Sequence, residues 1–119
     1  MATVLTQVGE EWIADKLTET VQTKAEYIAW GSGAGTSDKA DTSLFSEESE
    51  ARVQGTESQP AADKVRYVGT LTADGTKTIT NAGTFTASTA GVLVVKGDFT
   101  GVPLQQNDQI EFTIDLEIT

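Results

Sequence analysis

The side chains that most often carry out catalysis are missing from this chain. It contains no histidine and no cysteine, which removes the commonest general base, the commonest metal ligand, thiol nucleophiles and the Ser-His-Asp relay. Structural zinc sites built from these residues are excluded as well. The chemistry that remains is that of carboxylates, because 18 of the 119 residues are Asp or Glu. We therefore predict that the protein is not an enzyme and needs no cofactor.

The carboxylates form clusters, but none of these has the spacing of a recognisable site. The clusters are Glu10–Glu11, Glu47–Glu48 with Glu50, and Asp108 with Glu111. Glycoside hydrolysis needs two carboxylates that face each other across a cleft, and so many acids give chance pairs. A hydrolase stays open as an alternative. Candidate calcium ligands lie at 38–41 and at Asp98, yet no D-x-D-x-D-G loop is present. We predict no metal site, with solvated surface as the simpler interpretation.

A glycine-rich segment, Gly31-Ser32-Gly33-Ala34-Gly35, is the most unusual motif of the chain. A dinucleotide fingerprint needs G-x-G-x-x-G between a strand and a helix, and a phosphate-binding P-loop ends in Gly-Lys-Ser/Thr. Neither pattern is present. We predict a flexible surface loop that runs to about Asp41 and reaches a partner. The candidate contact residues on this segment are Trp30, Gly31, Ser32, Gly33, Gly35, Asp38 and Asp41.

The charge balance limits the kinds of partner. The formal net charge is −10, which argues against nucleic acid and against anionic membrane surfaces, because both bind clustered Lys and Arg. Two interpretations remain open: solubility through self-repulsion, or an acidic face that meets a basic partner. The sequence has no run of about 18 apolar residues and no secretory signal at its start. We expect a soluble protein made in a cytoplasm.

The N-terminal part predicts one helix, within Thr6–Glu19. The apolar stripe is Leu5, Val8, Trp12, Ile13, Leu17 and Val21, and Thr6 is the expected N-cap. Gly9 weakens this helix. A short strand follows at 25–30, and the acidic segment 43–51 favours a turn or two of helix. Trp12 and Trp30 are more often core residues than ligand platforms.

From Arg52 onward the hydrophobic period becomes two. We predict strands at 52–59, at 64–71, at 83–88, at 92–99 (buried on both faces) and at 110–118, with a break at 61–63 and a long turn at 101–108. Asp74-Gly75 predicts a hairpin that pairs Leu71 with Ile79.

The last strand alternates most clearly, because every second residue from Ile110 to Ile118 is apolar. Its opposite face carries Glu111, Asp115 and Glu117, which either protect a sheet edge or meet a basic partner. We include these three acids among the candidate contact residues.

Together these elements predict a mainly β protein: an antiparallel, jelly-roll-like β-sandwich with one short N-terminal helix. The 119 residues suffice for one domain. We expect a helix and loop over 1–50 and the sandwich core over 51–119.

The chain also resembles small virion proteins of tailed bacteriophages. The resemblance is carried by 8–17 (VGEEWIADKL), 27–33 (YIAWGSG), 69–83 (GTLTADGTKTITNAG) and 97–101 (GDFTG), together with the final strand. Such proteins look like capsid cement or decoration proteins, and related sequences are sometimes labelled tail-fibre-like. The implied fold is a jelly-roll-like β-sandwich, and the family brings no catalytic residues.

The resemblance implies a virion structural protein that is made in the host cytoplasm and binds the outer surface of the capsid. Its expected partner is the major capsid protein, bridged across neighbouring subunits, with self-association as a dimer or trimer and no contact to nucleic acid or membrane. The alternative is a tail- or fibre-associated module that binds another virion protein or a host glycan. For a glycan, the candidate aromatic platforms are Tyr27, Trp30 and Tyr67.

Overall fold

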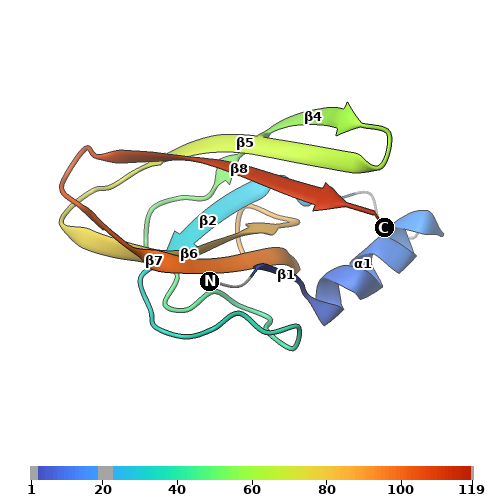
Figure 1. The fold of residues 1–119 in the computed structure, drawn as a ribbon, viewed down its shortest axis with the longest axis horizontal. Helices are drawn as coiled ribbons and strands as arrows, with labels where there is room; N and C mark the ends of the chain where they lie inside the picture. The colour runs from blue at the N-terminus through green and yellow to red at the C-terminus, as the bar shows by residue number, and fades with distance from the viewer. Residues whose placement is uncertain (1–2, 19–22, 119) are drawn as a thin grey trace.

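A computed structural model describes residues 3–18 and 23–118 and places their strands in two antiparallel sheets (Figure 1). In chain order the elements are β1 (Thr3–Leu5), α1 (Gln7–Leu17), β2 (Tyr27–Gly31), β3 (Val53–Gln54), β4 (Thr56–Ala61), β5 (Lys64–Thr72), β6 (Lys77–Phe85), β7 (Leu93–Leu104) and β8 (Gln109–Glu117). One sheet has the order β1-β7-β6-β2-β3 and the other β4-β5-β8. The expectation of a mainly β, antiparallel fold with one helix is confirmed.

The two sheets face each other across the main hydrophobic core. Ile28 and Trp30 from β2 pack in one cluster with Tyr67 and Leu71 from β5, and Trp30 meets Phe112 of β8 edge to face, with ring centroids 6.3 Å apart. This arrangement follows from alternation, because each strand sends every second side chain inward. The fold is a sandwich of two sheets, while the jelly-roll topology stays a prediction.

Helix α1 begins where the sequence predicts. Thr6 is the N-cap, and its side chain accepts a hydrogen bond from the Gly9 N–H at 3.0 Å. Gly9 has a packing role that was not expected, because a Cβ there would lie 2.8 Å from the Val94 carbonyl oxygen. The far end of the predicted apolar stripe is not buried: Leu17 is 81% exposed, and Val21 lies outside the described residues.

The hairpin expected at Asp74-Gly75 is wrong. β5 pairs with β4 and β8, whereas β6 pairs with β7 and β2, so the two strands belong to different sheets. Leu71 is opposite Ile110 in the ladder, not opposite Ile79. Both Leu71 and Ile79 lie in the core between the sheets, and their apolar match therefore reflects a shared core rather than strand pairing. The connection is an arch from one sheet to the other.

Several boundaries also differ from the predictions. The strand expected at 83–88 is the end of the longer β6, and β7 continues to Leu104 through the expected turn. Pro103 is tolerated because β1 pairs only with 95–97 of β7, leaving the end of β7 at an edge. Segment 43–51 contains turns and one β-bridge at Glu47 but no helix. The sandwich also begins before residue 51, because β2 lies inside the five-stranded sheet.

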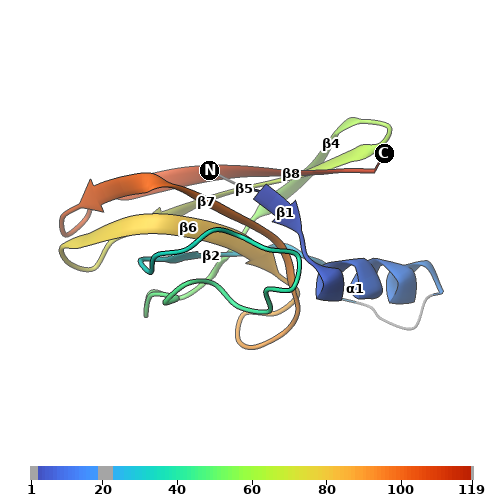
Figure 2. The same ribbon diagram turned by 60° about the horizontal axis from the view of Figure 1, so that its bottom comes forward.

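A third layer lies under the sandwich. The segment from Ser32 to Arg52 crosses the outer face of the five-stranded sheet, on the side away from β4, β5 and β8 (Figures 1 and 2). We call this segment, 32–52, the loop layer. Its Leu44 packs with Ala29, Phe85 and Leu93 in a second small core. The apolar run at 92–99 predicted burial on both faces, and the loop layer covers the second face.

Candidate binding surfaces

Lys96 of β7 anchors the loop layer to the sheet. Its side chain is completely buried, and its ammonium donates to Asp41 Oδ2 at 2.8 Å and to the Ser43 carbonyl at 2.9 Å. The same ammonium lies 3.3 Å from the centre of the Phe45 ring, a cation–π contact that strengthens when water is excluded. Burial opposes ionisation of Asp41, but the hydrogen bonds from Lys96 and from the Asp38 backbone, together with the charge of Lys96, outweigh it and lower the pKa of that carboxyl.

Lys77 of β6 forms a second anchor at the other end of the loop layer. Its side chain is 9% exposed and binds Glu50, Glu48 at 3.2 Å and Asp74 at 2.9 Å. Trp30 Nε1 also donates to Glu50, at 3.1 Å. Burial alone would raise the pKa of Glu50, yet the hydrogen bonds from Lys77, the Asp74 backbone N–H and Trp30 lower it to about 2.

Polar groups of the sheet hold the middle of the loop layer. Asn81, fully buried in β6, accepts from the Phe45 N–H and donates to the Phe45 carbonyl, each at 3.0 Å. The backbone N–H and C=O of Phe45 are therefore both held by one side chain of the sheet. Arg52, the last residue of the loop layer, forms two bonds with Glu47, donates to the Ala87 carbonyl at 3.0 Å and lies over the Phe85 ring.

The glycines of the loop layer give room to Phe45. A Cβ at Gly33 would lie 2.8 Å from the Phe45 carbonyl carbon, and a Cβ at Gly35 would lie 2.8 Å from the Phe45 ring. Gly35 also has a φ of 150°, which L side chains rarely adopt. We predicted a flexible loop from these glycines. In the structure they allow close packing instead.

The structure separates the candidate contact residues of this region into buried and accessible ones. Trp30 is 1% exposed and Gly31 is buried as the last residue of β2, so neither is available at the surface. Ser32 and Gly33 are half-buried, and Ser32 donates to Glu48. Gly35 and Asp38 are exposed, whereas half-buried Asp41 binds Lys96. Within 32–43 the accessible residues are thus 34–36, 38–40 and 42–43, and further along the loop layer 46–47, 49 and 51 are also exposed.

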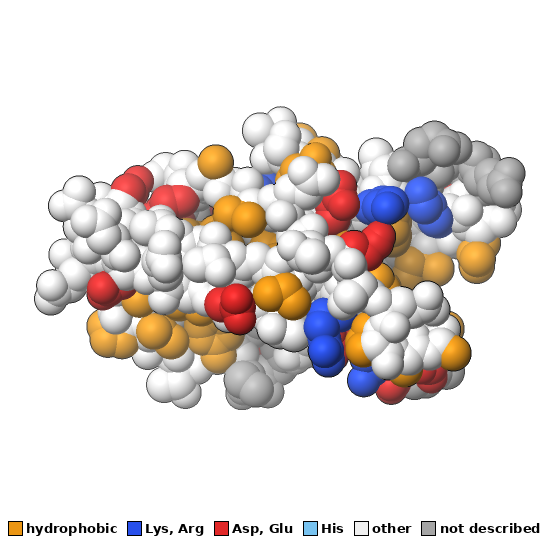
Figure 3. Space-filling model, turned by 90° about the horizontal axis from the view of Figure 1, so that it is seen from above, with side chains coloured by type: hydrophobic (Ala, Val, Ile, Leu, Met, Phe, Trp, Pro, Cys, Tyr) orange, Lys and Arg blue, Asp and Glu red, His pale blue; other side chains and the backbone are white. Residues whose placement is uncertain are grey.

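The acidic row of β8 lies on the outer face of the three-stranded sheet. Asp115 forms a two-fold hydrogen bond with Arg66 of β5, and Glu117 lies 3.7 Å from Lys64. Glu111 is opposite Thr70 and is exposed. The hydrogen bond from Arg66 lowers the pKa of Asp115. Figure 3, which looks onto this sheet, shows acidic and basic side chains next to each other, with a few hydrophobic side chains between them.

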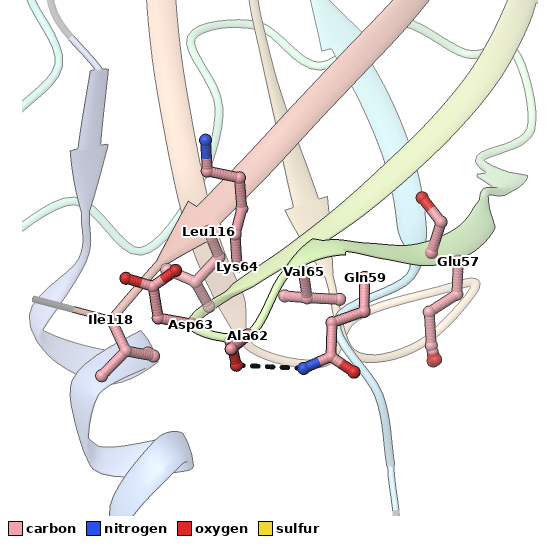
Figure 4. Close-up of a pocket in the computed structure, with 9 residues that line it drawn as sticks. Glu57, Gln59, Ala62, Asp63, Lys64, Val65, Leu116 and Ile118 are labelled. Atoms are coloured by element: carbon pink, nitrogen blue, oxygen red, sulfur yellow. Dashed lines mark hydrogen bonds between the residues drawn. The ribbon is translucent and has the colours of Figure 1, made fainter.

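A hollow of about 550 Å³ lies under the β4–β5 hairpin. Its floor is apolar, formed by Val65, Leu116 and Ile118, while Glu57 and Asp63 stand at its rim (Figure 4). Gln59 binds the Ala62 carbonyl across the hairpin turn, and Glu57 is paired with Lys24. The hollow holds no facing pair of free carboxylates, which paired-acid hydrolysis would need.

A second groove, of about 200 Å³, runs along the side of the sandwich between β7 and β8. Its lining includes Phe99 from β7, Phe112 and Ile114 from β8, and Thr3 from β1 across the opening. The groove exists because no strand joins β8 to the five-stranded sheet on this side.

Within residues 3–18 and 23–118, no group of three acidic residues is placed to hold a metal ion. The candidate ligands have partners within the protein: Asp98 accepts from the Ser37 N–H and Asp38 from the Ala40 N–H, each at 2.8 Å, while Asp41 binds Lys96. In the same part of the chain, no helix is long and apolar enough to cross a membrane.

Sequence reasoning missed the two anchoring lysines. Lys96 interrupts an otherwise apolar strand, and a charged residue on a strand buried on both faces must find a partner. That interruption was the available signal. Lys77 is outwardly an ordinary strand residue near a turn, and only the fold brings Glu48 and Glu50 to it.

Comparison of the chain with protein-family models, curated proteins and solved structures finds no match. The fold and its surfaces define the chain as a mainly β protein with two antiparallel sheets and an ordered loop layer.

Proposed function

We propose that this chain is a bacteriophage virion structural protein, most specifically a capsid cement protein that binds across neighbouring major capsid protein subunits. Packaged DNA presses outward on a shell held by many weak contacts. A small protein seated across a seam must detach before the subunits part. Repetition over the lattice and contacts to two subunits provide avidity. The resemblance to small phage virion proteins supports the class of protein, and the residues of the loop layer support the binding role.

The loop layer is the observation that carries the proposal. Its backbone is fixed by Lys96, Lys77 and Asn81 before any partner arrives. A surface that is already ordered does not lose conformational entropy on binding, so more of the contact energy appears as affinity. The exposed tip at 34–36 consists of the small residues Ala-Gly-Thr and suits close approach to another protein, while the tip at 38–40 adds the charged side chains of Asp38 and Lys39.

The carboxylates support an adhesive role more than a hydrolytic one. In the loop layer, Glu48 and Glu50 share the cation of Lys77. A general acid needs a raised pKa, whereas the pKa of Glu50 is lowered to about 2. The charge of −10 fits a partner met through protein surface rather than through nucleic acid.

A tail- or fibre-associated module is the second candidate. A glycan-binding form of it is less well supported, because two of the three aromatic candidates, Trp30 and Tyr67, are buried. A module that binds another virion protein would use the same loop layer. Copy number separates the two candidates, because cement occupies the whole capsid lattice whereas tail parts are few.

The test uses expanded capsids assembled without this protein. We expect purified protein to bind them with saturation at a fixed ratio to the coat subunit and to raise the temperature at which they open. The variant Asp38→Lys, at an exposed residue of the loop layer, should bind more weakly, while Glu11→Lys on helix α1 makes the same change in net charge and serves as the control. Binding without a change in capsid opening would contradict the cement role. No binding at all would contradict the capsid location.

A further inference from the structure

The edges of the two sheets differ in how they are protected. β1 and β3, the edges of the five-stranded sheet, have three and two residues. β4 carries Pro60 and a register irregularity between Ser58 and Ala61. All three devices hinder the addition of a further strand. β8 is also an edge, yet its nine residues contain no proline and keep one unbroken register with β5. Within the described chain, the end of β7 beyond Gly97 is also an edge, but it carries Pro103, so β8 is the long edge without such a device.

Among the described residues, the backbone groups of β8 that do not bond to β5 belong to its odd-numbered residues. The Ile118 N–H donates to the Asp63 carbonyl, and the Ala73 N–H donates to the Asp108 carbonyl, at the two ends of the β5–β8 ladder. Both pairs follow the register of that ladder. Because hydrogen-bonded pairs alternate in an antiparallel ladder, the even-numbered residues of β8 bond to β5. The N–H and C=O groups of Glu111, Thr113 and Asp115 therefore point away from β5, toward the open side.

The groove between β7 and β8 lies directly beside this edge. Phe112, Thr113, Ile114 and Asp115 line it from β8, and Phe99 lines it from β7. A strand added to β8 would send alternate side chains to opposite faces. One set would enter the apolar groove beside Phe112 and Ile114, and the other set would lie on the outer face of the sheet beside the acidic row.

Charge selects the occupant of this edge. A second copy of the chain pairing β8 with β8 would bring two acidic rows together, and like charges on neighbouring strands are destabilising. On the β5 side, Arg66 and Lys64 already pair with Asp115 and Glu117 of β8. An incoming strand with Lys or Arg on its outer face would place basic residues on the other side of the same acidic row. Glu111 has only Thr70 opposite it in β5, so a basic neighbour would be its first ionic partner in the sheet.

We propose that β8 is a docking edge for an extended protein segment that alternates basic and apolar residues and adds as a fourth strand to the three-stranded sheet. This is recognition by strand addition, in which backbone bonds give affinity and alternate side chains give specificity. The inference rests on the proposed function in one respect, which is that the segment belongs to a neighbouring coat subunit. The net charge of −10 favours encounter with such a basic segment.

The first experiment uses the full chain and a synthetic nine-residue peptide of alternating Lys and Val. Controls are a peptide of the same composition with its lysines in one block and a peptide of alternating Glu and Val. We expect the alternating Lys peptide to bind at least about 10-fold more tightly than either control, as measured by fluorescence anisotropy. Its binding should also slow amide exchange at Glu111, Thr113 and Asp115. Equal affinity for the block peptide, or binding without slower exchange at these amides, would overturn the proposal.

Two variants locate the contact. Thr113→Pro removes one N–H from the open side without removing a bond to β5, and should weaken binding about 10-fold or more. Glu111→Lys should weaken the Lys peptide and strengthen the Glu peptide, whereas Glu11→Lys, with the same change in net charge on α1, should leave both unchanged. If Thr113→Pro fails to fold, the exchange of preference in Glu111→Lys still decides. If Glu111→Lys keeps the preference for the Lys peptide over the Glu peptide, β8 is not the docking edge.

Capsid binding separates the failure of this inference from the failure of the proposed function. If Thr113→Pro and Glu111→Lys bind capsids as well as the unmodified chain, the edge is not the contact and the cement role stands. If the unmodified chain binds the peptide but no capsid, the edge stands and the cement role falls.

Discussion

The loop layer and the outer face of the three-stranded sheet both contain ion pairs, but the cations are buried in the loop layer and exposed on the sheet. In the loop layer, Lys96 is completely buried and Lys77 nearly so. On the three-stranded sheet, Arg66 and Asp115 are each about one third exposed. Water reaches both members of the second pair, whereas in the loop layer it is excluded from the lysines, although Asp41 is 23% exposed, so loss of a partner should matter more in the loop layer. The comparison teaches that burial, not the number of pairs, decides which charges this fold depends on.

The largest effect should come from Lys96→Met. It leaves Asp41 without its cation and removes the contact with the Phe45 ring, which we expect to lower the free energy of unfolding by about 2–4 kcal/mol. Urea unfolding followed by fluorescence measures this. The matched control is Lys39→Met, whose pair with Glu10 is exposed and should contribute at most about 0.5 kcal/mol. Equal losses of unfolding free energy in Lys96→Met and Lys39→Met would contradict the greater importance of the buried pair. Adding Asp41→Asn to Lys96→Met should recover part of the loss.

Gly33→Ala tests whether the loop layer is close-packed around Phe45. The added Cβ would meet the Phe45 backbone at 2.8 Å, and we expect a loss of about 1–3 kcal/mol. Gly75→Ala is the control, because nothing lies within 4 Å of its Cβ and the change should stay within about 0.5 kcal/mol. If both variants melt at the same temperature, the loop layer is not close-packed around Phe45.

Acid should weaken the loop layer within a defined pH range. The pKa of Glu50 is lowered from 4.5 to about 2, so its ionised form contributes stability that is present above pH 4.5 and is lost as the pH falls toward 2. The difference in unfolding free energy between the unmodified chain and Glu50→Gln should therefore shrink across that range. Urea unfolding at pH 7, 4.5, 3 and 2 measures it. A difference that stays constant would show that Glu50 acts through packing alone.

The smallest effect is expected on the three-stranded sheet. Arg66→Ala removes the two-fold bond to Asp115, yet both side chains reach water, and the loss should be about 0–1 kcal/mol. Thermal melting at low and high salt checks this, since a screened pair should respond to salt in the unmodified chain more than in the variant. A loss as large as that of Lys96→Met would contradict the role assigned to burial.

Local sequence signals predicted the elements better than their partners. Thr6 as N-cap, the inward face of β5 and the alternation of β8 were all readable, because they depend on neighbours along the chain. The predicted pairing of Leu71 with Ile79 was wrong because two apolar residues can meet either in one strand ladder or across the core between two sheets. The hydrophobic pattern does not distinguish these two arrangements. The loop layer was beyond reach for a similar reason: Phe45, Asn81 and Lys96 come together only after the sheet has formed.

The arch between β5 and β6 has a consequence for how the chain reaches its fold. After β5 the chain passes into the other sheet instead of turning back. The partner of β5, which is β8, is therefore made only after β6 and β7. The closure of a long segment must precede the contacts that reward it, which slows folding. We therefore expect β5 to keep an uncovered, pairing-competent edge during synthesis until residues 109–117 emerge. The nascent chain would be most vulnerable to wrong association in that interval.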